Sequence, residues 1–191
     1  MKIAIIYGHP DSESYCQQLA DAYVEGALAQ GAEIRKLELS KMDFVPVLKF
    51  GYKRRMEEEP DLVWAKQSIL WADHLVFVYP VWWGTMPSLL KGFIDRVFTP
   101  GYAFKYIKGS YFNEKLLKGK SARVIVTSDT PSWYVALIWR GMTKVQIKQT
   151  ILKYCGVNPV KYTHFGSIKW QARAKLENWI KKSYLFGYQL S

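Results

Sequence analysis

The residues of this chain that could do chemistry gather in three polar stretches, each directly after an apolar run. The first, GHPDSESYC (8–16), offers the imidazole of His9, the hydroxyls of Ser12 and Ser14, and backbone N–H groups at the start of a predicted helix. Such groups suit a phosphate or pyrophosphate, because a helix N-terminus presents unpaired N–H donors to an anion. The alternative is structural, since Asp11, Ser12 or Ser14 could equally cap that helix.

The second stretch, PVWWGTMP (80–87), carries two adjacent indoles, Trp82 and Trp83, followed by Gly84. Aromatic rings at the rim of a crevice form flat, apolar walls for a planar ligand, and a tight turn exposes backbone N–H groups at its edge. A flavin ring requires both, because donors near its N1, O2 and N5 atoms stabilise the reduced anion. The alternative is that both indoles fill the core or a subunit interface.

The third stretch, TSDTPSWY (127–134), follows another apolar run. Standard nucleotide motifs do not account for it: no G-x-G-x-x-G follows the first apolar run, and GKS at 119–121 lacks a phosphate-loop glycine because Glu114 stands in its place. Cys16 and Cys155 lie far apart and the three histidines are scattered, which favours neither a disulfide nor a zinc site. We expect no resident metal.

Hydrophobic periodicity predicts five strands that alternate with helices. The expected strands cover residues 2–7, 33–40, 73–81, 121–128 and 158–166. Helical spacing covers 14–31, 62–72, 87–98, 134–156 and 170–186, and a long surface loop is expected within 41–61. This alternation predicts an α/β fold with a right-handed, doubly wound parallel sheet.

The predicted topology decides where the three polar stretches lie. In doubly wound sheets the ligand sits beyond the carboxyl ends of the strands, beside the point where the winding reverses. With a flavodoxin-like strand order of 2-1-3-4-5, the first, third and fourth strands are neighbours, and each is followed by one of the polar stretches. The three loops should therefore converge on one site.

Composition and charge limit the remaining possibilities. The chain has 191 residues, of which 49% are hydrophobic, and we expect one domain over residues 1–191. It has no signal-peptide pattern and no apolar stretch of 18 residues, so we expect a soluble, cytoplasmic protein without an integral membrane segment. The net charge of +11 is spread over 35–55, 91–123 and 140–182, which indicates a solvated surface that steers small anions rather than a nucleic-acid tract.

The motifs together resemble a known family. IIYGHPDSESYCQQLADAY (5–23), YPVWWGTMPSLLKGFIDRVFTPGYAF (79–104) and TSDTPSWY followed by TILKYCGVNPV (150–160) are similar, in order and spacing, to flavodoxin-like NAD(P)H:quinone oxidoreductases of the DT-diaphorase type. Small bacterial NAD(P)H-dependent members are included in this family. The resemblance extends from Met1 to about Trp179.

The resemblance implies a role for each polar stretch. The loop after the first strand would hold the flavin phosphates and ribityl chain through His9, Ser14, Tyr15 and Cys16. The P-x-x-W/F-G turn would contact the ring through Pro80, Val81, Trp82, Trp83 and Gly84. The loop after the fourth strand would cover the other edge of the ring through Thr127, Ser128, Asp129 and Thr130. Tyr134 would line the substrate pocket.

The chain departs from the family pattern at two places. Where relatives usually carry Thr-Thr-Gly-Gly, this chain has Thr127, Ser128, Asp129 and Thr130. Both glycines are lost, which puts the donor geometry of that loop in question because glycine permits close backbone approach. Arg140 replaces a histidine near the substrate; it cannot relay a proton, but it could hold a phosphate or an anionic hydroquinone, or be an exposed helix residue.

The resemblance also implies an activity. We expect a ping-pong enzyme in which NAD(P)H reduces a bound flavin by hydride transfer, and a quinone or similar acceptor then enters the same slot. The flavin is expected to be FAD, with FMN as the alternative. Arg173 and Glu177 match the residues that relatives place near the adenine, although they could equally form an i,i+4 pair.

Relatives are dimers whose pocket the second subunit completes, so a homodimer is expected. Three other functions share some of these features. They are a flavin-binding regulatory subunit of an ion-efflux system, a basic nucleic-acid-binding protein, and an interaction protein with a degenerate pocket.

Overall fold

The computed structural model describes residues 1–191, and its centre is a parallel sheet of five strands. The strands are β1 (Lys2–Tyr7), β2 (Glu33–Glu38), β3 (His74–Pro80), β6 (Ser121–Thr127) and β7 (Val160–Phe165). Their order across the sheet is β2-β1-β3-β6-β7. Because β6 and β7 are the fourth and fifth strands of this sheet along the chain, the predicted order 2-1-3-4-5 is confirmed.

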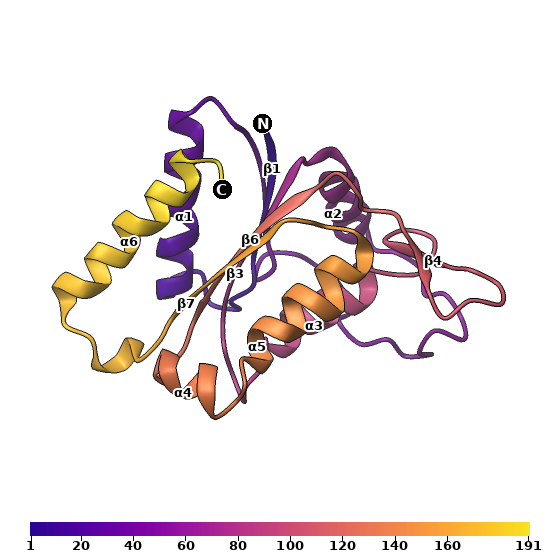
Figure 1. Ribbon diagram of the computed structural model, residues 1–191. Coiled ribbons are helices and arrows are strands. Elements are labelled where there is room, and N and C mark those ends of the chain that lie inside the picture. The colour runs from indigo at the N-terminus through magenta and orange to yellow at the C-terminus, as the bar shows by residue number, and fades with distance from the viewer.

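Helices cover both faces of the sheet (Figure 1). On one face lie α1 (Tyr15–Ala29) and α6 (Arg173–Tyr188). On the other lie α2 (Pro60–Trp71), α3 (Ser88–Val97) and α5 (Met142–Val145), which continues as the π-helix η1 (Gln146–Lys153). The short helices α4 (Ser132–Leu137) and η2 (Ile168–Trp170) follow the carboxyl ends of β6 and β7. No helix is both long and apolar enough to span a bilayer.

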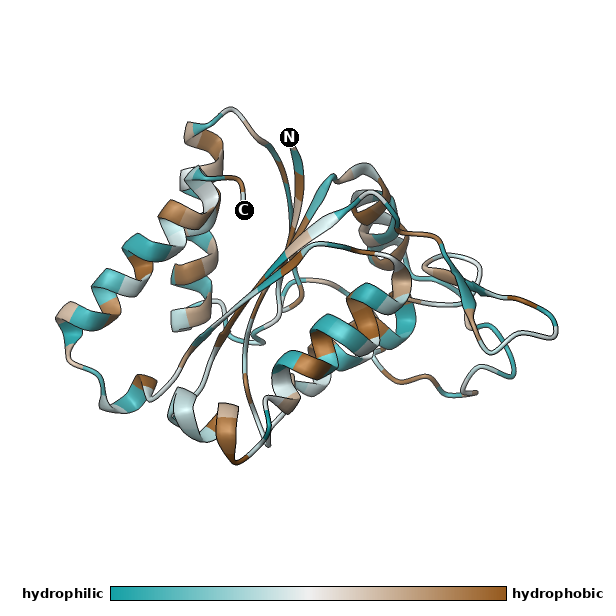
Figure 2. Cartoon of the chain, viewed as in Figure 1, coloured by the Kyte–Doolittle hydropathy of each residue, from teal (hydrophilic) through white to brown (hydrophobic).

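Each strand supplies apolar side chains to two cores, because successive residues of a strand point to opposite faces. In β1, Ile3, Ile5 and Tyr7 join the core under α1 and α6, whereas Ala4 and Ile6 join the core under α2 and α3. All five are buried. Figure 2 shows hydrophobic stretches along the strands and hydrophilic residues spread over the covering helices. A sheet buried on both faces explains the unbroken apolar runs of the sequence.

α1 and α6 approach each other at two glycines, one on each helix. A Cβ atom at Gly26 would lie 2.1 Å from the carbonyl oxygen of Tyr184, and one at Gly187 would lie 1.9 Å from that of Tyr23. Neither position can accept a side chain without moving a backbone. The glycines therefore fix how closely the two helices pack.

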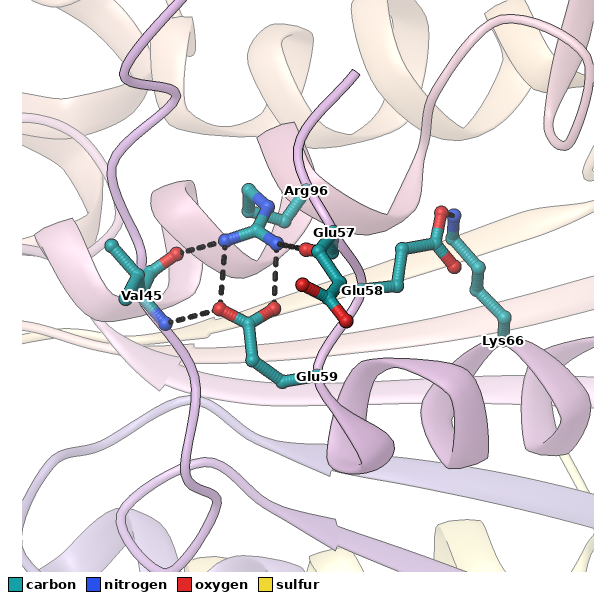
Figure 3. A network of polar contacts seen from close by, with 6 residues as sticks. All are labelled: Val45, Glu57, Glu58, Glu59, Lys66 and Arg96. Atoms are coloured by element: carbon teal, nitrogen blue, oxygen red, sulfur yellow. Dashed lines mark hydrogen bonds and ion pairs between the residues drawn. The ribbon is translucent and has the colours of Figure 1, made fainter.

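An ion pair between buried Arg96 and half-buried Glu59 holds the long loop before α2 against α3 (Figure 3). The Arg96 guanidinium donates to both carboxylate oxygens of Glu59, at 2.6 and 3.2 Å, and to the carbonyl oxygens of Val45 and Glu57, at 2.5 and 2.9 Å. The Val45 N–H donates in turn to Glu59 at 3.0 Å. Beside this network, Lys66 pairs with Glu58. The predicted surface loop at 41–61 is thus tied down through one arginine.

The protonation state of Glu59 follows from the same contacts. Partial burial works to raise the pKa of the carboxyl, but the hydrogen bonds from Arg96 and from the Val45 N–H outweigh it. The pKa of Glu59 therefore lies below its ordinary value, and the carboxyl is ionised at neutral pH.

Two features differ from the sequence-based prediction. An antiparallel hairpin of β4 (Phe104–Tyr106) and β5 (Asn113–Lys115) was not predicted. The prediction of one helical region over 134–156 was wrong, because Arg140 and Gly141 have left-handed φ angles of 50° and 64°. Two consecutive left-handed residues cannot continue a right-handed helix, so α4 ends and α5 begins in a new direction.

Replacing Arg96 should therefore destabilise the protein strongly. Arg96→Met leaves Glu59 charged without its cationic partner, and we expect it to lower the free energy of unfolding by about 3–5 kcal/mol in urea titrations at pH 7. The control is Arg55→Met, since Arg55 is exposed and makes no ion pair. Equal stability of the two variants would contradict the role given to this pair.

Candidate functional site

The three predicted loops meet in one pocket at the carboxyl ends of β1, β3 and β6. Its lining consists of His9, Ser14, Tyr15, Cys16, Pro80, Val81, Trp82, Thr127, Ser128, Asp129 and Ile168. Every one of these except Ile168 was among the residues expected to bind a cofactor. Ile168 lies just after β7, behind Gly166 and Ser167, in a loop that the sequence analysis did not single out.

A second pocket adjoins the first and shares Val81 with it. Its lining consists of Val81, Trp83, Gly84, Thr130, Trp139 and Met142. Trp139 and Met142 were not predicted as site residues. They stand on either side of Arg140 and Gly141, the left-handed residues that interrupt the expected helix. Because the interruption was not predicted, the position of these two side chains at the site could not be predicted either. The two pockets together form a mostly uncharged crevice beside the indoles.

The first loop both caps a helix and leaves donors free. The Ser14 hydroxyl oxygen accepts from the Gln17 N–H at 3.3 Å, so Ser14 is the N-cap of α1. The N–H groups of Tyr15 and Cys16, in the first turn, make no hydrogen bond within the chain. They therefore remain available to an anion, as helix N-termini commonly are. The capping alternative and the phosphate hypothesis are compatible at this loop.

His9 is oriented by its neighbours. Its Nδ1 accepts from the Asp11 N–H at 2.9 Å, and its ring meets Trp82 edge-on at 5.5 Å. Partial burial lowers the pKa of His9 below its ordinary value, although Asp11 works in the opposite direction. A neutral ring that accepts at Nδ1 carries its proton on Nε2. His9 therefore has one N–H donor that is not used by Asp11.

The tryptophan turn presents two unpaired amides. Trp82 and Thr85 exchange backbone hydrogen bonds of 2.8 and 3.0 Å, and Trp83 and Gly84 between them have left-handed φ angles of 51° and 72°. The N–H groups of Trp83 and Gly84 make no hydrogen bond in the chain. A left-handed conformation at a non-glycine residue costs about 1–3 kcal/mol, which marks Trp83 as a strained position.

The indoles do not belong to the core. The Trp83 side chain is fully exposed and that of Trp82 is 43% exposed. The alternative that both fill the core is therefore wrong, because neither is enclosed by the chain's own side chains.

The loop after β6 holds its shape without glycine. The Ser128 hydroxyl donates to the carbonyl oxygen of Thr130 at 2.7 Å, and its oxygen lies 2.8 Å from Nε2 of His164. Asp129 accepts from the Lys169 N–H at 3.1 Å. No residue of this loop has a positive φ angle, so serine and aspartate fit without strain. The N–H groups of Asp129 and Thr130 are unpaired, which answers the question raised by the missing glycines.

The buried side chains at this site are neutral at pH 7. Burial raises the pKa of Cys16 to about 12, and its thiol lies 3.1 Å from the Thr127 hydroxyl. Burial lowers the pKa of His164 to about 4. Neither group is placed to act as an acid or base near neutrality. No cluster of His, Cys, Asp and Glu could hold a metal ion.

Four predicted residues lie outside both pockets. Tyr134 packs edge-on against Trp139 at 6.0 Å and so supports a pocket residue rather than lining the pocket. Arg140 is exposed between α4 and α5. Arg173 and Glu177 form an exposed ion pair of 2.9 Å at positions i and i+4 on α6. The structure thus has the i,i+4 pair that the sequence left as an alternative.

Comparison with known proteins agrees with this geometry. The model of the family described as having a flavodoxin-like fold matches residues 1–182. An uncharacterized NAD(P)H oxidoreductase of Haemophilus influenzae is 28% identical over 88% of this chain and 85% of its own length. NAD(P)H dehydrogenase [quinone] 1 of Rattus norvegicus is 26% identical over 93% of this chain and 74% of its own length.

Among solved structures, that of Smu.1420 from Streptococcus mutans has a TM-score of 0.86. It is 32% identical to this chain, with 99% of this chain and 100% of that chain covered. Three further curated relatives match over 55–63% of their own length.

The burial of His164 predicts a specific loss of stability in acid. The folded-state pKa of His164 is about 4, below the ordinary value of 6.5, so the unfolded chain binds this proton more tightly. The stability that neutral His164 provides is complete above pH 6.5 and is lost as the pH falls towards 4. One such group contributes a slope of at most about 1.4 kcal/mol per pH unit.

We therefore expect urea unfolding between pH 7.5 and pH 4.5 to show a shallower pH dependence for His164→Gln than for the native protein. His74, whose pKa burial also lowers to about 4, remains in both proteins and supplies the common background. An unchanged slope in the variant would contradict the assignment.

Proposed function

This chain belongs to the family with a flavodoxin-like fold, and on that premise we propose that it is a flavin-dependent NAD(P)H oxidoreductase that reduces quinones or similar small acceptors. One observation carries the proposal. Two pairs of unpaired backbone N–H groups, Trp83 with Gly84 and Asp129 with Thr130, belong to the two loops that flank the crevice beside Trp82. Fixed amide donors beside an apolar wall suit the polar edge of a flavin.

The residues of the first pocket would hold the cofactor. The free N–H groups of Tyr15 and Cys16 and the Nε2–H of His9 suit the phosphate end. Pro80, Val81 and Trp82 would contact the ring, with Thr127 and Ser128 opposite. A bound flavin supplies two-electron transfer between NAD(P)H and an acceptor. The chain itself orients the ring, excludes water and supplies hydrogen-bond donors. Its buried groups Cys16 and His164 would not transfer protons, because their pKa values lie far from neutrality.

The adjoining pocket would take the nicotinamide and the acceptor in turn. Its walls, Trp83, Trp139 and Met142, are flat or adaptable apolar groups suited to planar rings. Tyr134 would act there by supporting Trp139. Arg140, exposed at the break between α4 and α5, would attract the negative charge of a reduced acceptor or of a cofactor phosphate.

For the cofactor we propose FAD, with FMN as the alternative. Ile168 lines the pocket and α6 begins at Arg173, five residues later, so the adenine end of FAD would reach towards Arg173 and Glu177. That contact would require their ion pair to open. FMN would need neither residue.

We also propose that the protein is a homodimer, that residues 1–191 form a single domain, and that it is located in the cytoplasm. Trp83 is fully exposed at the mouth of the second pocket, and Met142 beside it is also exposed. A second subunit would cover these apolar groups and close the slot.

The visible absorption spectrum of the purified protein tests the cofactor. We expect a yellow protein whose heat-released flavin is identified by chromatography. Trp82→Ala should weaken flavin binding about three- to tenfold, because it removes a ring wall. Trp64→Ala is the matched control, since Trp64 is also 43% exposed but lies on α2, away from both pockets. A colourless protein that binds no added flavin would overturn the proposal.

Steady-state kinetics test the shared slot. If NAD(P)H and the acceptor occupy the same apolar pocket in turn, double-reciprocal plots at several acceptor concentrations should be parallel. Trp139→Ala should raise the apparent KM for both substrates together. Intersecting lines, or a change in KM for one substrate only, would count against a common slot.

A further inference from the structure

Next to the proposed flavin crevice lies a half-buried histidine that neither pocket uses. His164 belongs to β7, where it pairs with Val126 of β6, and it lines neither of the two pockets of the site. Its imidazole has one hydrogen-bond partner in the chain, the hydroxyl of Ser128. Ser128 is only 7% exposed and does line the first pocket. His164 is therefore one contact removed from the place proposed for the flavin.

The Ser128 hydroxyl decides which nitrogen of His164 carries the proton. A carbonyl oxygen can only accept, so the 2.7 Å contact with the carbonyl of Thr130 uses the single proton of the hydroxyl. The 2.8 Å contact between the Ser128 oxygen and Nε2 of His164 then requires an Nε2–H donor. Because burial keeps His164 neutral at pH 7, its Nδ1 is unprotonated. These contacts form one hydrogen-bond chain, from His164 through Ser128 to the Thr130 carbonyl.

Backbone contacts hold the same loop at both ends. The Ser128 N–H donates to the carbonyl oxygen of Phe165 at 3.0 Å, and its carbonyl oxygen accepts from the Ile168 N–H, also at 3.0 Å. The Thr130 carbonyl oxygen, where the hydrogen-bond chain ends, accepts in addition from the Ser167 N–H at 3.3 Å. The two unpaired amides of the loop, those of residues 129 and 130, therefore lie on a short segment that the residues after β7 fix in place.

The loop after β7 packs closely against the loop after β6. A Cβ atom at Gly166 would lie 2.6 Å from the backbone nitrogen of Ser132 and 2.7 Å from the carbonyl oxygen of Thr130, so no side chain fits between the two loops. The Ser132 hydroxyl also donates to the carbonyl oxygen of His164 at 3.4 Å. The imidazole of His164 thus reaches Ser128 from a strand of the central sheet, which is a rigid base for a positioning group.

We propose that His164 is a positioning residue for the flavin, which acts through the Ser128 hydroxyl to orient the amides of Asp129 and Thr130 towards the ring. The inference rests on the proposed function, and it adds a residue that the pocket linings do not include. It requires serine at 128, because glycine has no hydroxyl to carry the hydrogen-bond chain. His164 itself neither touches the flavin nor moves a proton.

Oriented amides act on the redox balance of a flavin more than on its binding. The reduced ring carries the negative charge, so donors at its edge stabilise the reduced form more than the oxidised form. If His164 orients these donors, its loss should lower the affinity for reduced flavin more than that for oxidised flavin. A residue with a merely structural role would lower the stability of the protein and leave the ratio of the two affinities unchanged.

The first test uses the full chain without flavin. Nitrogen-15 NMR of the histidine rings should show His164 protonated at Nε2 and unprotonated at Nδ1, and the signal is assigned by its absence in His164→Gln. In Ser128→Ala the Nε2–H should lose its protection from exchange with water, and the amide signals of Asp129 and Thr130 should shift. A proton found on Nδ1 instead would overturn the proposal before any flavin is added.

The second test measures the midpoint potential of the flavin-loaded protein. His164→Leu should weaken the binding of reduced flavin about tenfold relative to oxidised flavin, which is a fall of about 30 mV for a two-electron couple. His164→Gln should restore the native potential, because its amide nitrogen stands near the place of Nε2. His164→Asn carries the same amide on a shorter side chain and should not.

A double-mutant cycle tests whether His164 acts through Ser128. Ser128→Ala should lower the potential about as much as His164→Leu does, and the double variant should lower it no further, since either change breaks the same hydrogen-bond chain. Additive shifts would mean that the two residues act independently, and they would contradict the proposal.

His74 supplies the matched control. It too is a buried histidine bonded to a serine hydroxyl, with its Nδ1 2.7 Å from the hydroxyl oxygen of Ser121. This pair lies at the start of β3 and β6, at the opposite end of the sheet from the site. His74→Leu should lower the free energy of unfolding in urea but leave the potential and the amide signals of Asp129 and Thr130 as in the native protein.

Two further results would overturn the proposal, and each can be told apart from a failure of the redox function. The first is a flavin-bound His164→Leu protein with native potential, which would refute the role of His164 while the flavin-dependent function stands. The second is an equal fall in potential in His74→Leu, which would show a general effect of lost stability. A protein that binds no flavin would overturn the redox function and this inference together.

Discussion

The parallel pairing of β1, β3 and β6 is the constraint on which the site depends. Tyr7 pairs with Val78 and Pro80 with Thr127, so the three strands end at one edge of the sheet. The pairing continues into the loops, because the Gly8 N–H donates to Val78 and the Val81 N–H to Thr127, at 2.8 and 2.7 Å. Loops that are far apart in the chain are thereby held within the reach of one ligand, on a base that is buried on both faces.

The amides of the site are useful because the chain itself leaves them unpaired. Buried or enclosed N–H groups are normally satisfied within a protein. Here the N–H groups of Trp83 and Gly84, which have left-handed φ angles, have no partner in the chain. The N–H groups of Asp129 and Thr130 are also unpaired, in a loop that side-chain hydrogen bonds of Ser128 and Asp129 hold. Unpaired N–H groups thus occur in both loops, with backbone strain at Trp83 in one and side-chain hydrogen bonds of Ser128 and Asp129 in the other.

Much of this arrangement is readable in the sequence. The strand runs and the convergence of the three loops follow from periodicity and from the rule that ligands bind beyond strand ends. Nearly all lining residues of the first pocket were implied by the family resemblance. Ile168, Trp139 and Met142 were not, since their position depends on the chain reversal at Arg140 and on the turn after β7. The β4–β5 hairpin could not be predicted either, because strands as short as Phe104–Tyr106 and Asn113–Lys115 show no hydrophobic periodicity. Likewise, the missing glycines put the donor geometry of the loop after β6 in question, yet Ser128 donates to Thr130 and Asp129 accepts from Lys169, and these contacts hold the loop without glycine.

The glycine contact between α1 and α6 has a consequence for how the chain acquires its structure during synthesis. Of the elements described, α1 is the first helix to leave the ribosome, whereas α6 is the last and follows β7 directly. Until α6 arrives, the outer side of α1 at Gly26 and the core around Phe165 have no cover. A nascent chain therefore carries a nearly finished sheet with one apolar flank open, the stage at which a holding chaperone would be most useful.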